Sequence, residues 1–141
     1  MNYLPWAVLA LLSYSMVAPL MRVATSGANP IPSNVAALVA NAVLVVVTLG
    51  VIAVSGEGVL PYLDDPKMRY VLGAGACLAV GILAYYRALS MGQVSIVAPV
   101  FAMFFVTSSV VGVLALEEPV TARKVAGVGF AVIAVVLVAG E

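Results

Sequence analysis

The side chains that could do chemistry in this 141-residue chain are few, and they interrupt or end long apolar runs. Tyr85, Tyr86 and Arg87 stand together at the end of one run, directly before a short polar turn. Two phenol rings and a guanidinium can stack on and hydrogen-bond to an organic solute at the mouth of a cavity. The same residues can instead anchor a helix at a membrane interface, where tyrosines are common and arginines extend to water. Both interpretations stay open.

Further polar groups lie inside the apolar runs. The amide of Asn41 is costly there unless it is paired, so it either hydrogen-bonds to another helix or contacts a ligand. Pro19 and Pro99 lack an N–H, which deprives the carbonyls of Ser15 and Ser95 of their usual helical donor. These sites are either packing kinks capped by the serine or parts of a cavity. The predicted cavity lining is Tyr14, Ser15, Pro19, Asn41, Tyr85, Tyr86, Arg87, Ser95 and Pro99.

The elements that carry these residues follow from composition. The chain is 65% hydrophobic and 9% charged, against about 25% charged residues in soluble domains, which indicates an integral membrane protein. About 20 helical residues cross a bilayer, and the continuous apolar runs favour helices over barrel strands. The predicted fold is all-α with five transmembrane helices in one domain, 1–141. The expected spans are 4–22, 34–55, 69–89, 94–115 and 122–140.

Several classes of function are excluded by what the chain lacks. It has no histidine and one cysteine, Cys77, so no metal site, intramolecular disulfide or cofactor is predicted. No Asp, Glu, Lys or His lies in the central part of a span, which argues against a carboxylate proton relay and against an intramembrane hydrolase. The net charge is zero and no basic patch occurs, so nucleic acid is not an expected partner. We therefore do not expect an enzyme.

Small residues recur along two of the spans. In the third span they are Gly73, Cys77, Gly81, Ala84 and Ala88, and in the fifth they are Gly127, Ala131 and Ala134. Small side chains let helix backbones approach closely in lipid. These stripes predict packing faces, either within one chain or between two chains, and the terminal fifth span is favoured for the second role.

Two connections carry specific signals. Ser90 to Gln93 leave room only for a tight turn, which predicts that the third and fourth spans are antiparallel neighbours. Pro119 ends the fourth span, and Thr121 can cap the N-terminus of the fifth helix by accepting a bond from a free backbone N–H.

A family resemblance rests on these residues. The segment YYRALSMGQVSIVAPVFAMFFVTSSVVGVLALEEPVTARKVAGVGFAVIAVVLVAG resembles the second half of an EamA-type repeat of the drug/metabolite transporter superfamily. The matching positions are Tyr86, Arg87, Ala88, Leu89, Pro99, Glu118, Thr121 and Gly127. The chain departs from the family pattern at Glu117, where many members have glycine, and at Phe105, where a second proline is common. The missing proline predicts a straighter fourth helix.

The resemblance implies a transporter built as one repeat of an inverted-repeat fold. Familiar members fuse two five-span repeats in opposite orientation, with the substrate between them. A lone repeat needs a partner, so the expectation is an antiparallel, dual-topology homodimer, or a pair with a related half-transporter. Four Lys or Arg lie on the N-terminal side against two on the other, a weak bias that favours an inside N-terminus, and our hypothesis is that the chain inserts in both directions.

The expected activity is alternating-access transport of small organic metabolites or amphipathic compounds across the cell membrane, with no cofactor. One alternative stays open, in which the protein is a non-transporting membrane subunit of a larger complex, such as a lipid-carrier flippase. Flux catalysed by the purified protein alone would distinguish the two.

Overall fold

The computed structural model describes residues 3–115, 117 and 119–140, and these residues form helices and loops without a strand. The prediction of an all-α membrane protein is confirmed. The helices are α1 (Tyr3–Ser15), α2 (Val17–Thr25), α3 (Ser33–Ser55), the short 3-10 helix η1 (Leu60–Tyr62), α4 (Met68–Met91), α5 (Val94–Ala102), α6 (Phe104–Ala115) and α7 (Ala122–Ala139). The chain divides into two compact units, Met1–Met91 and Gly92–Glu141, which are described in turn.

The predicted spans correspond to these helices. Within the described residues, four segments are long and apolar enough to cross a membrane: Tyr3–Thr25, Ser33–Ser55, Met68–Met91 and Val94–Ala115. Each reaches about 33 to 36 Å at 1.5 Å per residue, enough for a hydrocarbon core of about 30 Å. Helix α7 occupies the fifth predicted segment with 18 residues, about 27 Å of helix. That α7 crosses the membrane stays a prediction.

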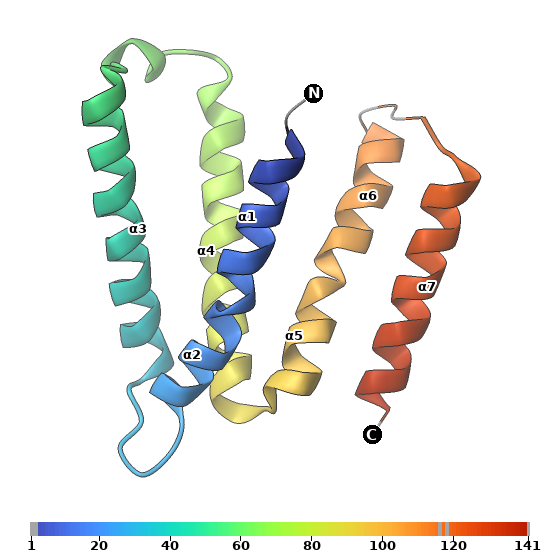
Figure 1. Ribbon diagram of the computed structural model, residues 1–141. Helices are drawn as coiled ribbons and strands as arrows, with labels where there is room; N and C mark the ends of the chain where they lie inside the picture. The colour runs from blue at the N-terminus through green and yellow to red at the C-terminus, as the bar shows by residue number, and fades with distance from the viewer. Residues whose placement is uncertain (1–2, 116, 118, 141) are drawn as a thin grey trace. The chain divides into compact units, whose positions relative to one another are not determined.

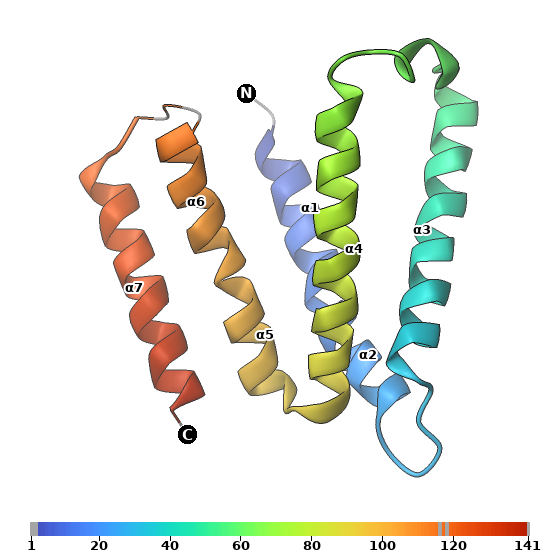
Figure 2. The ribbon, with the colours of Figure 1, turned by 180° about the vertical axis from the view of Figure 1, so that it is seen from behind.

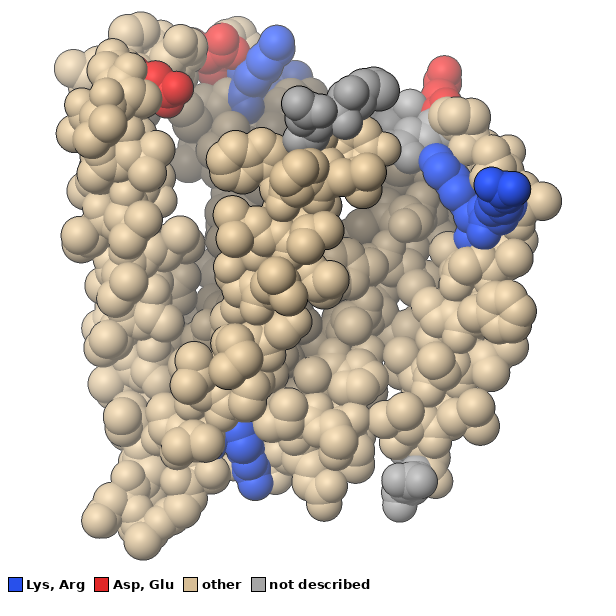
Figure 3. Space-filling model, in the orientation of Figure 1, with Lys and Arg blue, Asp and Glu red and all other residues tan. Residues whose placement is uncertain are grey.

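Large apolar side chains cover the surface of these helices. Val54 is 91% exposed, and Leu114 is 77% exposed. On the face shown in Figure 3, the charged side chains lie near helix ends and the surface between them is uncharged. Soluble proteins do not carry continuous apolar surface on this scale, so the surroundings of these helices are lipid or other membrane helices.

The first unit packs at one end. Helices α3 and α4 run antiparallel side by side, and α2 lies across the end where α3 begins and α4 finishes (Figures 1 and 2). The buried residues of this unit are Ala18, Thr25, Ser33, Ala36, Ala37, Tyr86 and Leu89, and we call them the closed end. Helix α1 buries no side chain, and the buried residues of α3 and α4 all lie at this end.

The first span is broken where its proline predicts. Helix α1 ends at Ser15 and α2 starts at Val17, and the intervening Met16 N–H lies 3.3 Å from Ser13 O in a tightened turn. Pro19 follows three residues later and removes the donor for the Ser15 carbonyl. The Ser15 hydroxyl donates to Leu11 O at 2.7 Å, so it does not cap the carbonyl that proline frees.

The fourth span is also broken, next to Pro99, where the sequence left a kink open; that it is straighter than a span with a second proline stays a prediction. Helix α5 contains Pro99 and ends at Ala102, and α6 resumes at Phe104. Between them the Met103 N–H bonds to Val100 O at 3.2 Å instead of to Pro99 O. One proline with a tightened turn after it therefore interrupts the helix without a second proline at position 105.

The loops end helices in ways that suit their residues. Gly56 stops α3 in the left-handed region, with φ of 71° and its N–H 3.0 Å from Ile52 O, a conformation that glycine adopts without steric cost. Thr121 caps α7 as predicted, since its hydroxyl accepts from Lys124 N at 3.3 Å. Glu117 has φ of 54°, which explains why glycine suits this position in the family pattern. Glu118 lies outside the described residues.

Candidate functional site

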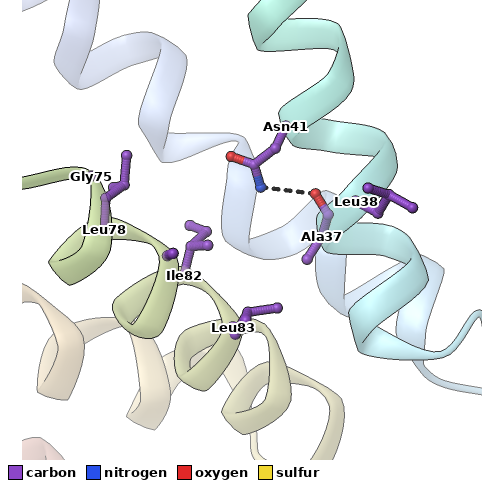
Figure 4. A pocket seen from close by; sticks show the side chains of 8 residues that line it. Ala37, Leu38, Asn41, Gly75, Leu78, Ile82 and Leu83 are labelled. Atoms are coloured by element: carbon purple, nitrogen blue, oxygen red, sulfur yellow. Dashed lines mark hydrogen bonds between the residues drawn. The ribbon is translucent and has the colours of Figure 1, made fainter. Parts of the chain in front are cut away.

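A crevice lies between α3 and α4 in the first unit. Its volume is about 340 Å³, at the lower end of the range for small-molecule sites. Asn41 is its one polar lining side chain, and no charged residue lines it. The lining residues are Ala37, Leu38, Asn41, Gly75, Leu78, Ala79, Ile82 and Leu83 (Figure 4). The crevice therefore suits an uncharged, mostly apolar group.

Asn41 directs one half of its amide into this crevice. Its Nδ2 donates to the Ala37 carbonyl of its own helix at 2.8 Å. The amide N–H therefore has a partner within α3 and, in the part of the chain that the structure describes, makes no hydrogen bond to another helix, which was one of the two roles expected for Asn41. Because a backbone carbonyl can only accept, the nitrogen must be the atom that faces it. Figure 4 shows the amide oxygen turned toward α4. That oxygen has no donor among the described residues, so a ligand with an N–H or O–H could supply one.

The closed end borders the crevice through Ala37, which is 2% exposed and lines both. At the same end Arg22 Nη1 donates to Leu89 O at 2.8 Å, across 67 residues of sequence. Leu89 is in the last turn of α4, where carbonyls lack a helical donor and the helix dipole favours a cation. Arg22 therefore caps α4 from a different helix.

The residues Tyr85, Tyr86 and Arg87 face different surroundings. Tyr86 is 5% exposed within the closed end, and its ring centroid lies 6.0 Å from that of Tyr85. Arg87 is exposed, and its carbonyl accepts from the Ser90 hydroxyl at 2.7 Å. None of the three lines the crevice between α3 and α4. Their contact with a solute stays a prediction.

The remaining candidates are divided between the two units. Tyr14 and Pro19 are exposed on the first span, on either side of its break at Met16. Ser95 and Pro99 belong to α5 in the second unit. Thus Asn41 lines the crevice, and the other predicted cavity residues do not.

The second unit contains a crevice of its own between α6 and α7. Its volume is about 520 Å³, and Ser109, Lys124 and Gly127 are among its lining residues. No neighbouring atom comes within 4 Å of a Cβ placed on Gly127. The predicted small face of α7 is therefore open at this position, and Ala131 and Ala134 continue it along the helix.

The small face of α4 is open in the same way. A Cβ placed on Gly73 or Gly81 would meet no atom within 4 Å, and Cys77 and Ala84 are exposed. At the two glycines, no described atom beyond the neighbouring part of α4 itself lies within that distance. Both roles that the sequence left open for this face, packing within one chain or between two chains, stay predictions.

Sequence reasoning missed Arg22. It assigned weight to Arg87 because two tyrosines precede it, whereas the bond that joins two helices is made by Arg22. The sequence did contain an indication of this bond, because the C-terminal ends of the first and third spans lie on the same side of the membrane. An arginine at the C-terminal end of one helix can reach the backbone carbonyls in the last turn of the other helix, which lack an intrahelical donor. The described residues contain no group of His, Cys, Asp or Glu that could hold a metal ion.

Comparisons with known proteins give one family match and one similar transporter. Residues 1–140 match the EamA-like transporter family. A protein of Sinorhizobium sp named "Uncharacterized transporter in cobO 3'region" is 32% identical over 127 residues, covering 89% of this chain and 89% of that protein. No solved structure gives a significant match. Apolar spanning helices and these two similarities together place the chain in the EamA-like transporter family of integral membrane transporters.

Proposed function

We propose that this transporter carries small organic metabolites or amphipathic compounds by alternating access across the cell membrane. The observation that carries the proposal is the α3–α4 crevice, where one unpaired amide oxygen faces an apolar lining. In a membrane such an oxygen has no water to bond. A solute with an apolar body and a hydrogen-bond donor satisfies both the lining and Asn41.

The active form in this proposal is an inverted homodimer. Its support is the open small face of α4, where a Cβ on Gly73 or Gly81 would meet no atom within 4 Å. Small residues on exposed membrane helices favour close helix contact, and a second copy offers the same face. Inversion of one copy would supply the second repeat that transporters of this architecture use. A related half-transporter could take the same place.

Broken first and fourth spans fit this function. Discontinuous helices are tolerated in membranes where they line a cavity or are satisfied by neighbours, and transporters use them at their binding sites. Here the breaks fall at Met16 and Met103. They provide points at which parts of a span can move relative to each other.

The test is flux in liposomes that contain only the purified protein. A panel of uncharged, amphipathic and charged solutes is compared with empty liposomes, and we expect protein-dependent flux of compounds that carry an apolar body and a donor. Lack of flux for every solute class would instead favour the alternative of a non-transporting subunit. Reporters fused to the C-terminus test topology separately, because signal from only one side of the membrane contradicts dual insertion.

A further inference from the structure

The closed end depends on the short helix α2. The first span buries side chains only in its second half, where Ala18 is 6% exposed and Thr25 is 5% exposed. Helix α2 contacts both α3 and α4. The side chains buried at the start of α3 are small, namely Ser33, Ala36 and Ala37, whereas those buried near the end of α4 are the larger Tyr86 and Leu89. Small side chains on α3 offer few steric barriers to separation, so the contacts of α2 with α4 are the ones that must be released.

Helix α2 has a joint at each end. On one side the helix is interrupted at Met16, next to Pro19. On the other side a loop of residues 26–32 follows, in which Gly27 has φ of 98°. A nine-residue helix between a break and a loop can rotate as a rigid piece.

One polar bond holds this piece against α4. Arg22 Nη1 donates to Leu89 O at 2.8 Å, and Leu89 is fully buried. A charge-assisted bond to a helix C-terminus is stronger than a neutral one. The Arg22 side chain makes no other polar contact in the described part of the chain, so loss of this bond frees it.

We propose that Arg22 is a conformational latch, which holds α2 over the closed end and releases it to rotate about the break at Met16. Release uncovers Ser33 and Ala37. Because Ala37 also lines the Asn41 crevice, an opened closed end gives that crevice access to the side of the membrane where Arg22 lies. In the proposed transport cycle, the bond holds α2 in the state in which the crevice is closed to that side of the membrane.

This inference rests on the proposed alternating-access transport, but its test measures accessibility and needs no flux, so the two can fail separately. The reporter is the near-isosteric Ser33→Cys, placed in a Cys77→Ser background of the full chain in liposomes. Asn34→Cys is the matched control, because Asn34 is the adjacent residue and is exposed. The rate of reaction with a membrane-impermeant maleimide is measured in the protein with native Arg22 and in the Arg22→Lys and Arg22→Gln variants.

We expect Arg22→Gln to raise the rate at position 33 by about tenfold or more and to leave the rate at position 34 unchanged, whereas Arg22→Lys should keep part of the protection. An unchanged rate at position 33 in a folded Arg22→Gln protein overturns the latch. If Arg22→Gln fails to fold, Pro19→Ala with Arg22 retained decides the question. Repair of the break should then slow labelling at position 33, and a rate equal to that of the protein with native Pro19 contradicts the proposal.

Discussion

Arg22 and Leu89 are 67 residues apart in sequence, and the guanidinium of the first lies 2.8 Å from the carbonyl oxygen of the second. The bond joins the C-terminal end of the first span to the C-terminal end of the third span. It ties α2 to the last turn of α4 within the closed end. A comparison of Arg22 with the exposed Arg87 separates the effect of this bond from the effect of charge.

Replacement of Arg22 by Gln should lower the free energy of unfolding by about 1.5–3 kcal/mol, the usual contribution of a hydrogen bond to a charged group. Arg87→Gln is the control, because its side chain is exposed and exposed substitutions change stability by about 0.5 kcal/mol or less. Thermal unfolding in detergent measures both. Equal losses for the two variants would show that charge at this end of the unit, and not the bond to Leu89, sets stability.

Replacement of Glu117 by glycine should make the second unit more stable. Its φ of 54° places a side chain in the left-handed region, which costs about 1–2 kcal/mol for residues other than glycine. Glu117→Gly should therefore stabilise the second unit by about 1 kcal/mol after the added flexibility of the unfolded chain is subtracted. Glu57→Gly is the control, since the positive-φ residues of the described chain do not include Glu57, and a small loss is expected there. A loss of stability in Glu117→Gly would contradict this account of the turn.

Thr121 should contribute to α7 through its cap. Its hydroxyl accepts from Lys124 N at 3.3 Å, and loss of such a cap costs about 1 kcal/mol. Thr121→Ala should destabilise the protein by about this amount, and Thr121→Ser should restore most of it. Hydrogen exchange at the first turn of α7 locates the effect. Equal exchange rates there in the native protein and in the Thr121→Ala variant would assign no role to the cap.

Asn41 tests the solute crevice. Asn41→Leu keeps the size of the side chain and removes the oxygen that faces α4, so transport efficiency for solutes with a hydrogen-bond donor should fall about three- to tenfold. Thr48→Val is the matched control in the same helix, because its hydroxyl bonds to Leu44 O at 2.8 Å and does not line the crevice. If both variants transport as well as the native chain does, Asn41 does not contact the solute.

Apolar runs of about 20 residues were enough to predict the helices and the membrane class, because lipid demands continuous apolar segments with internal backbone bonds. The cap at Thr121 was also predictable, since it depends on residues three apart. The break at Met103 follows the kink that Pro99 allows, but the exact residue at which the helix is interrupted was not predictable from the proline alone. The Arg22–Leu89 bond depends on how two distant helices pack, which no local pattern encodes.

We propose that the inverted pair of identical subunits meets through the small face of α4, whereas the sequence favoured the fifth span for this contact. Positions 73 and 84 lie on that face, about 16 Å apart along the helix axis. In an inverted pair, position 73 of one copy is level with position 84 of the other, whereas in a parallel pair each position is level with itself. Two differently tagged copies with Cys77→Ser, one carrying Gly73→Cys and the other Ala84→Cys, are co-expressed and oxidised in the membrane. We predict a disulfide between positions 73 and 84 and none between two copies of position 73, and a disulfide between two copies of position 73 without the mixed product would contradict the inverted dimer.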